Sequence, residues 1–131
     1  MLPADTLRAL RRSREFLADR FASEVLLAEA AAEAGYSAFH YQRLFQEAYG
    51  ESPAEFVRKL RLERAERLLC QFGVSVSDAC FEVGYRSVGT FSARFTREFG
   101  QPPSEYRRVF ASPQIWALKA IPACFLAGLN R

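Results

Sequence analysis

The sequence contains few of the residues that build metal centres or disulfide frameworks. It has three cysteines, an odd number, and a single histidine, His40. The cysteines, Cys70, Cys80 and Cys124, lie at neither metal-ligand nor redox-pair spacing and have apolar neighbours, so we expect buried free thiols in a reducing compartment. One histidine without nearby cysteines or paired carboxylates cannot complete a metal site of ordinary ligand number. We therefore expect no metal and no other cofactor.

Long apolar runs are also missing. The first 13 residues contain no apolar stretch of the kind that signal peptides have. The longest uncharged run near the end, IPACFLAGLN, is too short to cross a bilayer and contains a proline. We expect a soluble cytoplasmic protein that has no membrane partner.

Neither a catalytic motif nor a large excess of one charge is present. The chain has no Ser/His/acid arrangement and no glycine-rich phosphate loop, so we expect no enzymatic activity. Lys and Arg number 18 against 15 Asp and Glu, a net charge of +3 that permits a polyanionic partner without requiring one. Half of the residues are hydrophobic, which favours a folded core over disorder.

The sequence does contain an internal repeat. GYSAFHYQRLF begins at Gly35, and GYRSVGTFSARF begins 49 residues later at Gly84. The match extends upstream, where EAAAEAG at 29–35 corresponds to DACFEVG at 78–84. Two copies are too few for a solenoid and instead indicate a tandem domain.

The first copy reads as two helices joined by a tight turn. Gly35 is suited to ending a short helix, and Ser37 offers an N-cap for the next one. Apolar residues then recur at steps of three and four, which predicts the buried stripe of an amphipathic helix; they are Tyr41, Leu44, Phe45, Ala48 and Tyr49.

The second copy repeats this plan. We expect Ser77 to cap its first helix, Gly84 to end it and Ser87 to cap the second helix. A short helix, a glycine turn and a second amphipathic helix make a helix-turn-helix. The buried stripe of the second helix is formed by Phe91, Phe95 and Phe99.

The remaining segments are helical as well. Residues 54–72 contain neither glycine nor proline and predict a helix about 28 Å long that joins the copies. Thr6–Phe21 predicts another, with Leu7, Leu10, Leu17 and Phe21 facing inward. No segment alternates as a strand does. The fold class is therefore all-α, with two helix-turn-helix subdomains, a long central helix and about seven helices.

The outward face of the first copy's second helix has the chemistry of a base reader. An amide and a guanidinium match the edges of adenine and guanine in the major groove, and Phe39 suits a thymine methyl group or a sugar. The alternative is a solvated polar face, which the glycine turn and the repeat disfavour. The residues, spaced i, i+3, i+4 and i+7, are Phe39, Gln42, Arg43 and Gln46.

A central helix of about 28 Å would allow both second helices, at 38–49 and 88–99, to enter successive major grooves, which lie about 34 Å apart. One chain would then read an asymmetric site as a monomer. We expect the partner to be double-stranded DNA.

The combined pattern resembles the DNA-binding domain of AraC/XylS-type bacterial transcription regulators over about residues 6–110. The second copy carries Gly84-Tyr85, Phe91, Phe95, Phe99-Gly100, Pro103 and Glu105-Tyr106-Arg107, and the first carries Ser37 to Phe45, Gly50, Ser52-Pro53, Phe56, Arg61, Ala65 and Leu68-Leu69. The resemblance implies a sequence-specific transcription regulator. By motif, the base-reading residues of the second copy are Val88, Gly89, Ser92 and Ala93.

These second-copy residues are small, so we expect unequal roles for the two copies. The first supplies most of the direct base readout, whereas the second mainly positions the protein on the backbone. Arg94 takes the position of Leu44 and is expected at the edge of the buried stripe. Candidate phosphate contacts are Ser37 and His40, the latter alternatively a plain surface residue, together with Arg86, Ser87, Thr90 and Arg97.

The expected domain organisation follows from the repeat. Residues 1–52 form the first subdomain, 53–72 the joining helix, 73–111 the second subdomain and 112–131 a tail that packs on the domain or docks on a partner. The length leaves no room for a sensor domain, so we expect a regulator controlled by its own abundance. The alternative is a protein-interaction adaptor that contacts RNA polymerase or another regulator and binds DNA weakly.

Overall fold

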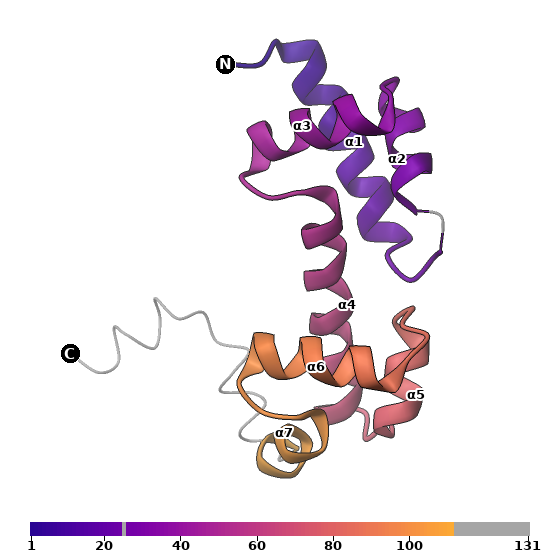
Figure 1. The fold of residues 1–131 in the computed structure, drawn as a ribbon, viewed down its shortest axis with the longest axis vertical. Helices are drawn as coiled ribbons and strands as arrows, with labels where there is room; N and C mark the ends of the chain where they lie inside the picture. The colour runs from indigo at the N-terminus through magenta and orange to yellow at the C-terminus, as the bar shows by residue number, and fades with distance from the viewer. Residues whose placement is uncertain (25, 112–131) are drawn as a thin grey trace, which may run out of the picture. The chain divides into compact units, whose positions relative to one another are not determined.

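A computed structural model describes residues 1–24 and 26–111 of the chain. Within these residues the protein consists of seven α-helices and has no strand, which confirms the predicted all-α class (Figure 1). The predicted tail over residues 112–131 lies outside the described residues. The helices are α1 (Ala4–Asp19), α2 (Leu26–Ala34), α3 (Ala38–Tyr49), α4 (Pro53–Cys70), α5 (Val76–Glu82), α6 (Val88–Phe99) and α7 (Pro103–Phe110).

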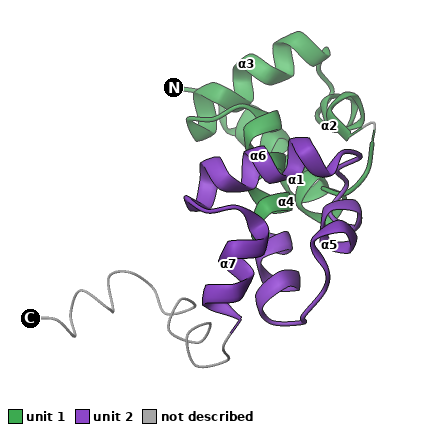
Figure 2. Cartoon of the chain, turned by 60° about the horizontal axis from the view of Figure 1, so that its bottom comes forward, with its two compact units in different colours: residues 1–63 green, residues 64–131 purple. Residues whose placement is uncertain are grey.

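The chain forms two compact units, coloured separately in Figure 2. Unit 1 comprises residues 1–63, and unit 2 begins at Arg64, so the division falls inside α4. The first helix-turn-helix, α2–α3, lies in unit 1, and the second, α5–α6, lies in unit 2. None of the helices described here combines the length and the apolar composition needed to cross a membrane.

The core of unit 1 is formed where α1, α2 and α3 pack together with the start of α4. Helix α1 contributes Ala9, Leu10, Ser13 and Leu17, a stripe with the spacing of one helix face. Leu7 does not belong to this stripe and is 41% exposed, so the prediction that it faces inward is wrong. Its position on the helix lies to one side of the face that Leu10 and Leu17 define.

The core of unit 2 is rich in aromatic side chains. Phe91 and Phe95 of α6 are fully buried, and the ring of Phe95 lies edge-on to that of Tyr106 of α7, with centroids 5.3 Å apart. Cys70 and Cys80 are buried in this unit, as expected, and burial raises the pKa of the Cys80 thiol. Cys124 lies outside the described residues.

Two details of α4 and α5 differ from the sequence prediction. The N-cap of α5 is Ser75, whose hydroxyl accepts the Asp78 N–H at 3.1 Å, and Ser77 lies inside the helix. Helix α4 ends at Cys70, two residues before the predicted end at residue 72, and Phe72 is 60% exposed. Arg61 of α4 is part-buried and donates to the carbonyl oxygens of Phe21 (2.7 Å) and Ser23 (3.1 Å).

Candidate nucleic-acid interface

Local sequence sets both ends of α3. The Ser37 hydroxyl accepts the His40 N–H at 3.2 Å, as the predicted N-cap requires. At the other end Gly50 adopts a left-handed conformation with φ 75°, and its N–H donates to the Gln46 carbonyl oxygen at 2.8 Å. The helix is therefore 12 residues long, about 18 Å.

The inner face of α3 is anchored by buried aromatic residues. Tyr41 and Phe45 are 1% and 0% exposed. The Tyr41 hydroxyl donates to the Ser13 hydroxyl of α1 at 2.9 Å, and burial raises the pKa of Tyr41, although the hydrogen bond opposes this effect. These contacts fix the rotation of α3 about its axis and so determine which side chains face outward.

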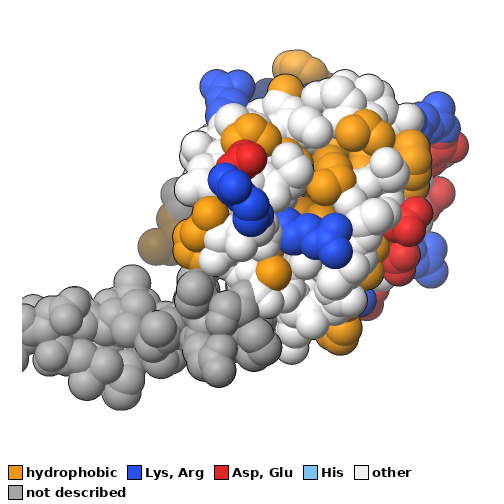
Figure 3. All heavy atoms as spheres, turned by 90° about the horizontal axis from the view of Figure 1, so that it is seen from below, with side chains coloured by type: hydrophobic (Ala, Val, Ile, Leu, Met, Phe, Trp, Pro, Cys, Tyr) orange, Lys and Arg blue, Asp and Glu red, His pale blue; other side chains and the backbone are white. Residues whose placement is uncertain are grey.

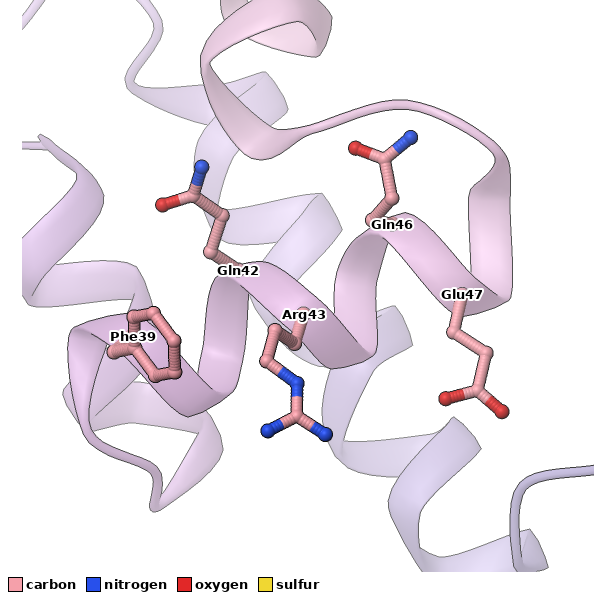
Figure 4. A pocket seen from close by; sticks show the side chains of 5 residues that line it. All are labelled: Phe39, Gln42, Arg43, Gln46 and Glu47. Carbon is pink, nitrogen blue, oxygen red and sulfur yellow. The ribbon is translucent and has the colours of Figure 1, made fainter.

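The outward face of α3 carries the four predicted base readers. Phe39 is 73% exposed, and Gln42, Arg43 and Gln46 are exposed as well. Together with Glu47 they line an open hollow of about 400 Å³ (Figure 4). In this view Arg43 and Glu47 extend to one side of the helix and the two glutamines to the other.

Glu47 is the member of this surface that the sequence prediction missed. It lies four residues after Arg43 and eight after Phe39, and therefore on the same helical row. Extending the predicted i, i+3, i+4, i+7 face by one further residue would have included it.

The candidate phosphate contacts at the start of α3 are both accessible. Ser37 is exposed, and because its oxygen accepts the cap hydrogen bond, its proton is free to donate to a phosphate. His40 is exposed too, and its ring lies edge-on to that of Tyr36 at 5.1 Å between centroids.

Helix α6 repeats the construction of α3. Ser87 accepts the Thr90 N–H at 3.3 Å, and Gly100 ends the helix in a left-handed conformation with φ 82°. Phe91 and Phe95 form the buried face. The same cap, stripe and stop thus occur in both halves of the repeat.

The outward face of α6 differs from that of α3 in its small side chains. Gly89 and Ala93 are exposed, whereas Val88 and Ser92 are part-buried. The Thr96 hydroxyl donates to the Ser92 carbonyl oxygen at 2.7 Å, so its proton is already engaged within the helix. Arg94, expected at the edge of the buried stripe, has an exposed side chain. Exposed candidates for phosphate contact in this half are Arg86, Ser87, Thr90 and Arg97.

A family model described as a helix-turn-helix domain matches residues 30–109. The chain belongs to the AraC-type helix-turn-helix family of DNA-binding transcription regulators. The resemblance seen in the sequence is thereby confirmed. The AraC-type match covers α3 to α6 completely and therefore includes both outward faces.

Other proteins are similar over most of this AraC-type region. The chain is 35% identical over 75 residues to "Probable transcription factor PqrA" of Proteus vulgaris, covering 57% of this chain and 62% of that protein. It spans less than two thirds of the length of the curated relatives that it matches.

Solved structures show the same fold. A probable AraC family transcriptional regulator from Rhodopseudomonas palustris superposes with a TM-score of 0.72 at 27% identity, covering 81% of this chain and 99% of that one. The DNA-binding domain of AdpA, solved in complex with a target DNA, superposes with a TM-score of 0.73 at 24% identity, covering 78% and 92%.

Proposed function

We propose that this protein is a non-enzymatic, cytoplasmic transcription regulator that binds double-stranded DNA sequence-specifically and reads bases chiefly with α3. The observation that carries the proposal is the outward face of α3. Gln42 and Arg43 are exposed there beside Phe39, on a helix whose inner face is fixed by buried Tyr41 and Phe45. An amide and a guanidinium that are fixed in direction are suited to adenine and guanine edges.

Helix α6 has a supporting role in this proposal. Its small outward residues allow close approach to the groove, and its exposed arginines supply charge for the DNA backbone. Gly89 supports this reading: a Cβ added there would meet only the Ser87 Oγ, at 3.6 Å, so packing does not demand glycine. Glycine is an unfavourable helix residue, and under this proposal the close approach of the helix backbone to DNA explains its presence.

We further propose that α3 and α6 enter successive major grooves and that one chain suffices. Support comes from α4, which runs unbroken over 18 residues, about 27 Å, and carries residues of both cores. Phe56 and Val57 belong to the unit 1 core, and Leu68 and Leu69 are buried beyond the unit boundary. An asymmetric site without a palindrome is the expected target.

Random-sequence selection followed by mobility shifts over a salt series tests the proposal. We expect a selected motif with two parts about one helical turn apart and binding that weakens as salt rises. Base changes in the half read by α3 should weaken binding more than changes in the half read by α6. Equal losses from both halves would contradict the unequal roles, and the absence of any motif would contradict sequence-specific binding.

A second candidate, a protein-interaction adaptor that contacts RNA polymerase, is favoured by exposed aromatic side chains. Phe72 and Phe81, both in the second unit, are 60% and 55% exposed. Figure 3 shows hydrophobic side chains at the surface beside Lys and Arg side chains. Under this function Phe81→Ala would abolish polymerase binding and leave DNA binding intact. Purified polymerase that does not bind the wild-type chain would exclude it.

A further inference from the structure

Glu47 is an unexpected residue at its position on α3. It is the one acidic residue of this helix, and it lines the same hollow as Phe39, Gln42, Arg43 and Gln46. DNA phosphates repel a carboxylate. A neutral or basic residue would therefore be expected at this position of a helix face that binds DNA. The repeat makes the contrast direct, because the corresponding position of α6 is Arg97.

Helix stability does not account for Glu47. It lies in the last turn of α3, where the negative end of the helix dipole disfavours a carboxylate. In the described part of the chain neither Glu47 nor Arg43 makes an ion pair, although they are four residues apart. Both side chains are exposed and extend to the same side of the helix in Figure 4. They are therefore both available to a ligand on that side.

We propose that Glu47 is a specificity-determining residue that accepts a hydrogen bond from the N4 amino group of a cytosine. This inference rests on the proposed function of α3 as the base-reading helix. In the major groove, cytosine presents an amino donor, which a carboxylate can accept. The same carboxylate is repelled by sites that offer only acceptors, such as guanine. Glu47 thus contributes discrimination rather than affinity.

The spacing on α3 limits where this cytosine lies. Arg43 and Glu47 are one helical turn apart, about 6 Å along the axis, and base pairs are about 3.4 Å apart. The cytosine is therefore expected within about two base pairs of the guanine read by Arg43. Gln42 and Gln46 form the second row of the face and contact other base positions.

Random-sequence selection with the wild-type chain and Glu47 variants tests this assignment. Glu47→Ala is expected to lower the preference for cytosine at one position of the selected motif by about 5-fold or more. The same variant should keep the preference for guanine, which Arg43→Ala is expected to lose. Glu47→Gln is expected to move the preference at that position from cytosine to adenine, since glutamine pairs with adenine. Binding of Glu47→Ala to non-specific duplex should be equal or tighter than that of the wild-type chain.

Glu33→Ala is the matched control. Glu33 is an exposed acid of the same unit but lies on α2, so its removal changes the charge equally and should leave the motif unchanged. A Glu47→Ala motif identical to that of the wild-type chain, or one weakened equally at every position, would overturn the inference. If the wild-type chain selects no motif at all, the proposed sequence-specific function is contradicted, and the role of Glu47, which depends on that function, is contradicted as well.

Discussion

The hydroxyl of Tyr106 on α7 donates a hydrogen bond to the carboxylate of Glu66 on α4. The tyrosine side chain is only 2% exposed, and its ring also contacts Phe95 of α6. Tyr106 therefore joins three helices of unit 2. Desolvation, together with the neighbouring carboxylate, raises the pKa of Tyr106 well above its ordinary value near 10.

This raised pKa predicts how stability depends on alkaline pH. The folded state keeps the Tyr106 proton where the unfolded state loses it, so the contribution is full below pH 10 and declines as the pH rises further. Tyr106→Phe should cost about 1.5–3 kcal/mol of unfolding free energy at pH 7, because a hydrogen bond to a charged group is lost. In urea titrations the gap between the two proteins should narrow above pH 10. A gap that stays constant to pH 11 would contradict the assignment.

The Ser13–Tyr41 hydrogen bond predicts an asymmetry between two substitutions. Ser13→Ala leaves the buried Tyr41 hydroxyl without its acceptor and should cost about 1–3 kcal/mol. Tyr41→Phe should cost less, about 0.5–1.5 kcal/mol, because Ser13 still donates to the Leu10 carbonyl oxygen at 2.7 Å. Thermal and urea unfolding measure both. A larger loss of unfolding free energy for Tyr41→Phe than for Ser13→Ala would show that the donor and acceptor roles in these two hydrogen bonds are wrongly assigned.

Two serines near the start of α5 provide a direct test of the cap. Ser75→Ala removes the hydroxyl that accepts the Asp78 N–H and should destabilise unit 2 by about 1 kcal/mol. Ser77 lies inside the helix at an exposed position, where alanine is a favourable residue. Ser77→Ala should therefore be neutral or slightly stabilising. Unfolding of the two variants side by side decides the matter, and equal effects would refute the cap assignment.

Two exposed arginines should affect DNA binding in different ways. Arg43→Ala is expected to cost about 1–3 kcal/mol on the selected site and to relax the preference at one base pair. Arg97→Ala, at the position of the repeat that Glu47 occupies in α3, should weaken binding to all sequences alike and reduce the salt slope by about one. Titrations on specific and random duplexes over several salt concentrations distinguish the two. Identical behaviour would mean that the roles are wrongly divided.

Features set by local chemistry were predictable from the sequence. Ser37 and Gly50 delimit α3 through contacts within a few residues, and the aromatic stripe between them can point only to the core. The all-α class and both helix-turn-helix units follow from such signals, which the sequence displays twice.

Features set by tertiary contacts were not predictable in this way. Ser13 is buried because it bonds to Tyr41, 28 residues away, and nothing near it in the sequence marks it as a core residue. Leu7 looks apolar enough for the core, yet it lies off the buried stripe. At α5 the sequence offers two serines as caps, and only the backbone geometry distinguishes Ser75 from Ser77.

The left-handed glycines at residues 50 and 100 limit how many base pairs α3 and α6 can each contact. Each stops its helix after 12 residues, about 18 Å, which corresponds to roughly five base pairs. If α3 and α6 enter major grooves centred about 10 base pairs apart, as proposed, the two helices inspect about ten base pairs in all, and the roughly five base pairs between the two stretches go unread. Mutations in that spacer should alter binding only through the stiffness or twist of the duplex.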